Sequence, residues 1–396
     1  MFMFAQGKPL TTHFVLKLAA AASLFLVVLF FFLPHDATSR IISIPRVDLT
    51  PSDRPSTPAP AAPPPTTPLD VIPNTVHFVY ILPNGTDNFN FQFSHLLSLY
   101  AAWHHWRPDT IYLHTNAAAA GPEIARARNG TAGKWNRHIF NSTLFNLRIN
   151  TVPVPTHAAN GKELANMEHR SDFVRVQAVH DLGGVYIDWD VHALRDLRPL
   201  RESGFRAVAG RQLGGQVNSG TFLSAKGGRM ITLWREQMHK VYTGGWTTHS
   251  NEVITRVGQR LVGEPGGREM LIMEREAFAP GSWKAEDTDA LFGVHEDVES
   301  NLAGYTAGME LPGFEEEFGA RWERPGDFKE WERDWSYTYL LHAFTPDRWS
   351  HKVEGFEHIT PRYVLERRSN FARAVYPIAK IMYDKGLIGV DDSHEG

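Results

Sequence analysis

The chain has 396 residues, of which 42% are hydrophobic and 12% aromatic, enough apolar material for a large packed core. Its net charge of −4 gives no sign of a nucleic-acid-binding surface, so we expect no nucleic-acid partner. It contains no cysteine, which excludes disulfides, thiolate metal sites and a cysteine nucleophile.

The amino-terminal residues predict a membrane anchor. As a helix, residues 14–33 would span roughly 30 Å, about the thickness of a bilayer core, and residues 18–33 carry no charge. A cleaved signal peptide is the alternative, but the apolar run is long for one and no A-x-A cleavage site follows it. We therefore expect an uncleaved transmembrane signal anchor behind a cytosolic tail of residues 1–13.

Potential glycosylation sites indicate which side of the membrane the body occupies. Positive charges are nearly balanced across the span, so they do not decide its orientation. Three N-x-S/T triplets follow the span and begin at Asn84, Asn129 and Asn141. We expect a single-pass type II protein of the Golgi or another secretory compartment, with a lumenal body.

Composition divides the rest of the chain. Residues 34–73 are rich in Pro, Thr, Ser and Ala and predict an extended stem, because proline lacks the donor that helices and ladders need. Residues 74–375 then form the predicted catalytic domain, and residues 376–396 a carboxyl-terminal tail.

Within that domain, strand and helix patterns alternate. Strands are predicted at 75–80, 111–114, 147–154 and 185–187, and a helix at 93–106. A second helix is predicted at 171–182, with Ser171 as its N-cap and Gly183 ending it. This alternation predicts an α/β fold with a mostly parallel mixed sheet, whose ligands bind at the carboxyl ends of the strands.

Two carboxylates follow the last of these strands. Asp188 and Asp190 stand two residues apart, a spacing that points side chains the same way along a strand. Oxygen ligands of this kind suit a hard divalent cation that keeps positions open for phosphates. An acidic pair alone is weak evidence, since such pairs usually face water.

A charged pair lies on the preceding helix. Asp172 and Arg175 are three residues apart and share one helical face. One interpretation is a surface ion pair of little energetic consequence. The other is a binding role, in which Asp172 accepts sugar hydroxyls and Arg175 meets a phosphate or sugar oxygen.

The stretch 169–191 resembles the DXD sugar-binding region of glycosyltransferase family 32, which includes fungal Golgi α-mannosyltransferases. The shared features are Ser-Asp with a following Arg, and a Gly-Gly-x-Tyr-x-Asp-x-Asp segment. Stretches at 72–80, 217–221, 277–283 and 339–342 look similar too. The resemblance covers roughly residues 72–350 and implies a GT-A fold, a single nucleotide-sugar-binding domain.

The resemblance also implies site residues. Asp188, Asp190 and the late His342 would hold Mn²⁺ or Mg²⁺ against the donor diphosphate. Residues expected to bind the donor sugar or nucleotide are Asp172, Arg175, Tyr80, Tyr186 and Asn218. Asp188, Asp190 and Asn218 form the expected catalytic set, although Asn-Ser-Gly is equally typical of a turn. Trp189, bulkier than the family's usual residue, packs either beneath the sugar or into the core.

The expected reaction is transfer of a hexose from a nucleoside-diphosphate sugar, GDP-mannose or a UDP-hexose, to a glycan or glycolipid acceptor. Resemblance to retaining enzymes implies retention of the anomeric configuration. One alternative is a catalytically idle relative that binds sugar or nucleotide and scaffolds other transferases. Another is a metal-dependent phosphohydrolase of the secretory pathway, which no hydrolase motif in the sequence favours.

Overall fold

The computed structural model describes residues 72–141, 144–313, 320–346 and 351–396, which belong to one compact unit, Thr67–Gly396. The predicted cytosolic tail, the transmembrane segment 14–33 and nearly all of the stem lie outside the described residues. Among the residues that are described, no helix is both long and apolar enough to cross a bilayer.

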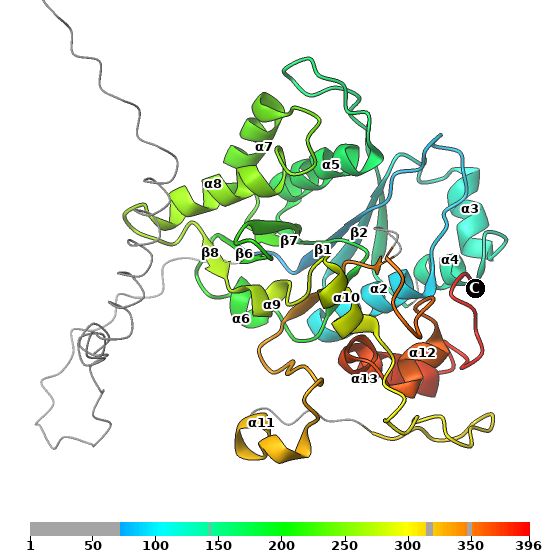
Figure 1. The fold of residues 1–396 in the computed structure, drawn as a ribbon. Coiled ribbons are helices and arrows are strands. Elements are labelled where there is room, and N and C mark those ends of the chain that lie inside the picture. Colours follow the sequence, from blue (N-terminus) through cyan, green and yellow to red (C-terminus); the bar gives the residue numbers. More distant parts are fainter. Residues whose placement is uncertain (1–71, 142–143, 314–319, 347–350) are drawn as a thin grey trace, which may run out of the picture. The chain divides into compact units, whose positions relative to one another are not determined.

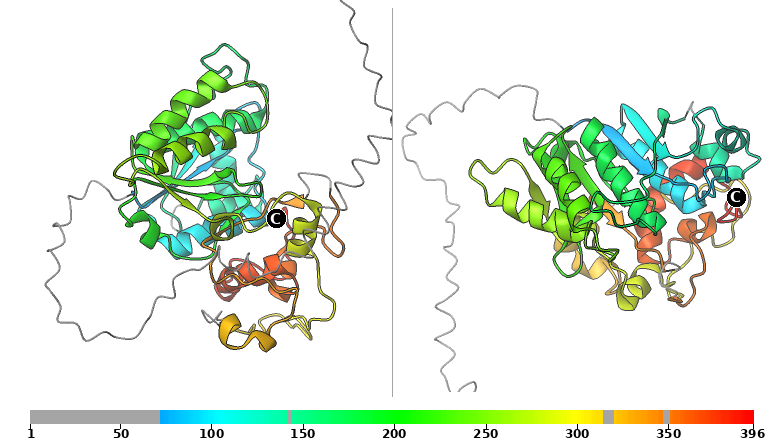
Figure 2. Two further views of the ribbon diagram at one scale, coloured as in Figure 1. Left: turned by 60° about the vertical axis from the view of Figure 1, so that its left-hand side comes forward. Right: turned by 90° about the horizontal axis from the view of Figure 1, so that it is seen from above.

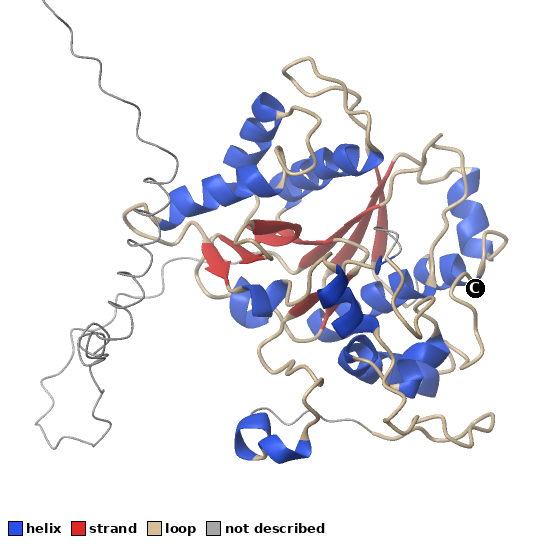
Figure 3. Cartoon of the chain, viewed as in Figure 1, coloured by secondary structure: helices blue, strands red, loops and turns tan. Residues whose placement is uncertain are grey.

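A seven-stranded mixed sheet forms the centre of this unit (Figures 1 and 3). Its strands, in the order of the sheet, are β3 (Leu147–Thr151), β2 (Thr110–Thr115), β1 (Thr75–Val79), β4 (Gly184–Ile187), β7 (Val217–Ser224), β6 (Ala207–Arg211) and β8 (Leu271–Met273). The first four run parallel, β7 is antiparallel to β4 and to β6, and β6 and β8 are parallel. The predicted α/β fold with a mostly parallel mixed sheet is confirmed.

Helices cover both faces of the sheet (Figure 2). One layer contains α5 (Met167–Leu182), α7 (Arg229–Val241) and α8 (Asn251–Val262). The other contains α2 (Phe93–Trp106), α4 (Lys134–Ile139), α10 (Ala285–Phe292), α12 (Pro361–Glu366) and α13 (Asn370–Asp384). Shorter elements are α3 (Pro122–Asn129), α6 (Arg198–Arg201), α9 (Arg275–Phe278), α11 (Ala320–Glu323) and η3 (Pro325–Asp327).

Strand β4 shows how the sequence builds two cores from one sheet. Val185 and Ile187 pack into the core beneath α2 and α13, whereas Tyr186 packs into the core beneath α5, α7 and α8. Successive side chains of a strand point to opposite faces, so a fully apolar strand is what a sheet covered on both sides requires.

Helix α5 begins one turn earlier than predicted. Ser171 is not its N-cap: Asn166 occupies that position with extended backbone, and Ser171 lies inside the helix. The predicted end is confirmed, because Gly183 has φ +69° and its N–H donates to the carbonyl of Val179. A side chain at Gly183 would meet the backbone nitrogen of Lys226 at 2.6 Å, so the turn into β4 needs glycine.

Other boundaries differ in detail. Helix 93–106 is confirmed, while the strand predicted at 147–154 ends at Thr151. Residues 217–221, for which a turn was one interpretation, lie within the buried strand β7. The predicted start of the carboxyl-terminal tail, residue 376, falls inside α13, where Tyr376 is fully buried.

Candidate active site

The two aspartates lie where the sheet changes direction. Strand β4 pairs with β1 on one side and with β7 on the other, and Asp188 follows its last residue. The Asp188 N–H donates to the carbonyl of Gly220 on β7, at 2.8 Å. Since chain connections diverge on either side of this point, it is where ligands bind in open α/β sheets.

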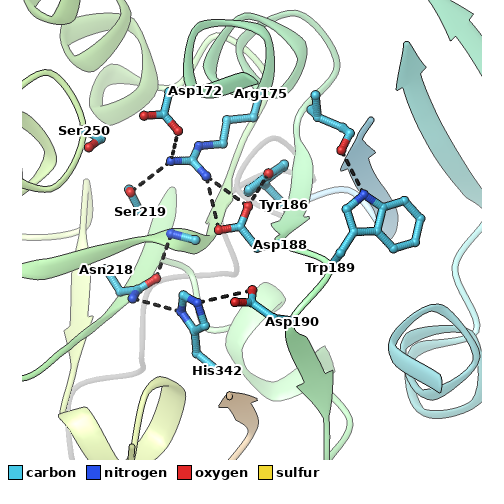
Figure 4. Close-up of polar contacts among 12 residues, drawn as sticks. Asp172, Arg175, Tyr186, Asp188, Trp189, Asp190, Asn218, Ser219, Ser250 and His342 are labelled. Carbon is cyan, nitrogen blue, oxygen red and sulfur yellow. Dashed lines mark hydrogen bonds and ion pairs between the residues drawn. The ribbon is translucent and has the colours of Figure 1, made fainter. Parts of the chain in front are cut away.

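Trp189 separates the two carboxylates and points into the core. Its Nε1–H donates to the carbonyl of Val79 at 2.9 Å, and its ring stacks on Phe78 with 4.3 Å between centroids. The ring packs against the core, and the half-buried Trp189 also lines the pocket, so a place beneath the sugar stays a prediction. Anchored in this way, the indole fixes the turn that carries Asp188 and Asp190 (Figure 4).

His342 joins the aspartates from a distant part of the sequence. A small two-stranded sheet pairs β5 (Val191–Ala193) with β9 (Leu340–His342), and its register places Val191 opposite His342. The Nε2 atom of His342 lies 3.3 Å from Oδ1 of Asp190. Ligand atoms of Asp188, Asp190 and His342 all lie within 4.8 Å of one another.

Gly220 makes room for this cluster. A Cβ atom at position 220 would lie 2.6 Å from Oδ2 of Asp188 and 2.7 Å from Cε1 of His342. Any larger residue would push the carboxylate and the imidazole apart. Glycine here therefore permits their close approach.

The cluster fits a divalent cation. Two carboxylates and one imidazole suit Mn²⁺, and Mg²⁺ would rely mainly on the carboxylate oxygens. The Nε2 atom of His342 is buried and makes no hydrogen bond, while Nδ1 lies 3.1 Å from Nδ2 of Asn218. A buried nitrogen of this kind beside two carboxylates is consistent with a ligand atom.

Asp188 is held by two buried side chains. Arg175 Nη1 donates to Oδ1 of Asp188 at 3.0 Å, and the hydroxyl of Tyr186 donates to the same oxygen at 2.5 Å. Burial lowers the pKa of Arg175, but Asp172 and Asp188 raise it by more, so the guanidinium stays charged. Burial, followed by the charge of Asp188, raises the pKa of Tyr186, which keeps its proton for this bond.

Asp172 and Arg175 form a buried ion pair, not a surface one. Their side chains are only 11% and 6% exposed, and Oδ1 of Asp172 pairs with Nη2 of Arg175. The other oxygen of Asp172 lies 2.7 Å from Nε2 of His249, and Arg175 Nη2 also donates to Ser219 at 3.0 Å. A continuous polar network thus links α5, β4 and β7 (Figure 4), and His249 extends it to the segment before α8.

A pocket of about 660 Å³ opens above this network. That volume lies within the range of small-molecule sites. Residues predicted for the site that line it are Asp172, Arg175, Tyr186, Asp188, Asp190, Asn218 and His342. Tyr80 lies outside the lining and packs against Phe89, Phe91 and Trp189.

The potential glycosylation sites lie on the surface. Asn84, Asn129 and Asn141 are exposed, and Oδ1 of Asn129 accepts a hydrogen bond from the hydroxyl of Thr131 at 2.7 Å. The other residues of the third triplet, 142 and 143, lie outside the described ranges. Glycosylation of these asparagines stays a prediction.

Sequence reasoning missed several residues at the site. His249 contacts Asp172, Ser219 contacts Arg175, and Trp246 lines the pocket. Ser219 lies within the stretch 217–221 that the sequence analysis singled out, so the sequence offered a signal for it. His249 and Trp246 belong to no recognisable motif, and only the packing of their segment on α5 brings them to the site.

A family model described as "Glycosyltransferase sugar-binding region containing DXD motif" matches residues 95–205. The matched segment includes Asp172, Arg175, Asp188 and Asp190, and ends before Asn218 and His342. The match supports a glycosyltransferase family, without singling out the fungal α-mannosyltransferase branch. No curated protein sequence matches the chain.

Several solved glycosyltransferase structures are similar at low identity. The glycosyltransferase GlyE of Streptococcus pneumoniae TIGR4, in its apo form, is 12% identical over 80% of this chain and 64% of its own, with a TM-score of 0.36. Mouse xyloside xylosyltransferase 1 is 13% identical over 52% and 87%, with a TM-score of 0.32. The galactosyltransferase LgtC, in complex with donor and acceptor sugar analogues, is 13% identical over 79% and 100%, with a TM-score of 0.34.

Proposed function

We propose that this protein is a metal-dependent glycosyltransferase. In this proposal it moves a hexose from a nucleoside-diphosphate sugar, GDP-mannose or a UDP-hexose, to a glycan or glycolipid acceptor, within a GT-A-type domain. The observation that carries the proposal is the Asp188, Asp190 and His342 cluster. It lies at the carboxyl end of β4, inside a pocket, and both aspartates belong to a segment that matches a DXD sugar-binding family model.

Asp188, Asp190 and His342 would hold Mn²⁺ or Mg²⁺ in this site. Bound there, the cation would supply charge neutralisation for the diphosphate leaving group. The chain's own contribution is orientation: Arg175 and Tyr186 hold the Asp188 carboxylate, and the β5–β9 pairing holds His342 beside Asp190. Groups positioned before the reaction need no reorganisation during it.

The donor sugar would lie between the cation site and α5. Asp172 and Asn218 both line the pocket, and their oxygens and amide can accept from or donate to sugar hydroxyls. Arg175 is 6% exposed and already engaged with Asp172, Asp188 and Ser219. We therefore assign Arg175 the role of orienting these groups. The oxygens of Asp172 already contact Arg175 and His249, and would accept a sugar hydroxyl through their remaining lone pairs.

Retention of the anomeric configuration completes the proposal. The acceptor hydroxyl would attack from the face that the diphosphate leaves, forming the new C1–O bond as the C1–O bond to phosphate breaks. The departing phosphate would take the hydroxyl proton. Support for this stereochemistry is the resemblance to retaining families, and nuclear magnetic resonance of the freshly formed product tests it, since an inverted product would contradict it.

Placement in the Golgi membrane is likewise a proposal. Its support is the apolar run at residues 14–33, the proline-rich stem and the three exposed asparagines that begin N-x-S/T triplets. Two measurements test this placement: localisation of the full-length chain in cells, and glycosidase treatment to detect attached N-glycans. A cytosolic chain without N-glycans would overturn it.

The test of function is turnover of a nucleotide-sugar panel by the full-length protein, with Mn²⁺ and with chelator. The panel contains GDP-mannose, UDP-galactose, UDP-glucose and UDP-N-acetylglucosamine, each with and without a mixture of oligosaccharide acceptors. We expect metal-dependent release of the nucleoside diphosphate from one donor. Failure to bind any donor would overturn the proposal, and acceptor-independent release of inorganic phosphate would favour a phosphohydrolase instead.

A further inference from the structure

An exposed tryptophan stands in the wall of the same pocket. Trp246 is 51% exposed and lies in the segment between α7 and α8. Within the described residues, the other large hydrophobic side chains with such exposure are Val262 and Tyr337, and neither lines the pocket. A single exposed hydrophobic side chain is common on protein surfaces, so the distinguishing feature of Trp246 is its place in the pocket wall.

Contacts with helix α5 hold this tryptophan in place. Its ring lies 5.5 Å from the ring of the buried His169, whose Nδ1 lies 2.9 Å from the hydroxyl of Tyr242. At the other end of the segment, His249 lies 2.7 Å from Asp172. Both ends are thus attached to α5, the helix that also carries Arg175.

Hydrogen bonds inside the segment add to this order. The hydroxyl of Thr248 donates to the carbonyl of Gly245 at 3.2 Å, and the hydroxyl of Thr247 donates to Glu252 at 2.7 Å. The N–H of Glu252 donates in turn to the carbonyl of Thr247 at 3.0 Å. A side chain that is ordered before binding loses less conformational entropy when a ligand arrives.

The surroundings of Trp246 suit a sugar ring. Polar side chains that share the pocket wall are Glu168, Ser171, Thr247 and Ser250. A pyranose has one face of C–H groups and a rim of hydroxyls. The C–H face complements the electron-rich face of an indole, and the rim needs carboxylate and hydroxyl partners of the kind found here.

We propose that Trp246 is the stacking platform of an acceptor subsite that binds a pyranose ring. The inference rests on the proposed function, because it names the ligand beside the donor. The candidate cation cluster follows the end of β4, and the donor nucleotide would lie beyond the carboxyl ends of the neighbouring strands β4 and β1, where Val79 lines the pocket. Asp172, which we propose to hold the donor sugar, is buried, whereas Trp246 is exposed in the pocket wall and accessible to an incoming glycan.

The experiment compares Trp246→Ala and Trp246→Phe with a control, Tyr337→Ala, in the full-length protein. Tyr337 is 51% exposed as well, so the control removes a similarly exposed aromatic ring away from the pocket. Saturation-transfer nuclear magnetic resonance measures binding of methyl α-mannoside, lactose and chitobiose. Kinetics measure the KM for donor and for acceptor separately, and thermal unfolding checks the fold.

We expect Trp246→Ala to weaken sugar binding and raise the acceptor KM about tenfold, a stacking loss on the order of 1.4 kcal/mol. Trp246→Phe should recover most of the binding, and Tyr337→Ala should resemble the unmodified protein. A rise in the donor KM alone would overturn the acceptor assignment. Absence of sugar binding by the unmodified protein would overturn the subsite, and Mn²⁺-dependent nucleotide binding in the same sample would show whether the proposed function fails with it.

Discussion

Two polar clusters in this protein contain buried histidine, one inside the sheet and one at the candidate site, and they differ in how the imidazole nitrogens are bonded. In the sheet, Nδ1 of His77 on β1 lies 2.9 Å from Nε2 of His114 on β2. Asn150 donates to Nδ1 of His114 at 2.9 Å, and Nε2 of His77 donates to the carbonyl of Gly183 at 2.8 Å. Every ring nitrogen of this pair is therefore occupied, and both side chains are completely buried.

The site cluster is arranged differently. One nitrogen of His342 faces Asn218, and the other is buried beside Asp190 without a hydrogen bond. Burial lowers the pKa of His77 to about 4 and that of His114 to about 3, so the pair in the sheet stays neutral. The comparison teaches that a candidate ligand needs both a nitrogen without a hydrogen bond and carboxylates beside it, because the buried His192 has two such nitrogens and belongs to no candidate cluster among the described residues.

Removing a carboxylate from the Asp188, Asp190 and His342 cluster should give the largest loss of activity. In Asp188→Asn we expect transfer activity to fall by a factor on the order of 100 or more, because several kcal/mol of charge stabilisation is lost. Initial-rate assays with the active donor measure this. Asp384→Asn, an exposed carboxylate on α13, is the control and should retain full activity. An active Asp188→Asn protein would remove the aspartate from the catalytic set.

Removing the imidazole of His342 should weaken metal binding more than it lowers the stability of the fold. In His342→Ala we expect Mn²⁺ affinity to fall roughly 10–100-fold, as changes around metal sites typically do. Calorimetric titration of Mn²⁺ measures the affinity without reference to turnover. The matched control is His351→Ala, a partly exposed histidine beside Asp289, which should leave the affinity unchanged. Equal affinities in all three proteins would exclude His342 as a ligand.

Removing an imidazole from the sheet should lower the stability of the fold and leave metal binding unchanged. In His114→Leu, His77 and Asn150 lose their partner, and a buried unsatisfied group costs about 1–3 kcal/mol. We expect the free energy of unfolding to fall by about that amount, measured by urea titration. Mn²⁺ affinity of the folded protein should not change. A variant that loses metal affinity and keeps its stability would reverse the comparison.

The buried pair should also make the stability of the fold depend on pH. The pKa values of His77 and His114 in the folded protein, about 4 and about 3, lie below the ordinary value of 6.5. The unfolded chain therefore binds more protons below pH 6.5, and stability is lost as the pH falls from there towards 4 and 3. Each histidine contributes up to about 1.4 kcal/mol per pH unit.

Urea titrations at pH 7, 6 and 5 measure this slope, and His114→Leu should make it shallower. Other histidines whose pKa burial lowers, among them the buried His192 and the half-buried His95 and His105, contribute to the slope in both proteins and do not alter the difference. Parallel slopes for the two proteins would show that the pair does not titrate on unfolding.

Much of the fold followed from local patterns. Helix α2 and the end of α5 at Gly183 were predictable, because periodic burial and a left-handed glycine are properties of neighbouring residues. The start of α5 was placed one turn late, since Ser171 is a good N-cap residue and Asn166 preceded a helical turn without strong apolar periodicity. Boundaries depend on weak preferences that packing overrides.

The sequence by itself determined the alternation of strands and helices and the adjacency of Asp188 and Asp190, because both depend on residues close in the chain. Only the tertiary structure decided the rest of the site. Strand register brought His342 to Asp190, and helix packing brought His249 to Asp172 and Trp246 to the pocket wall. These contacts join residues far apart in sequence, and the free energy that selects them comes from burial of the whole core, not from a local motif.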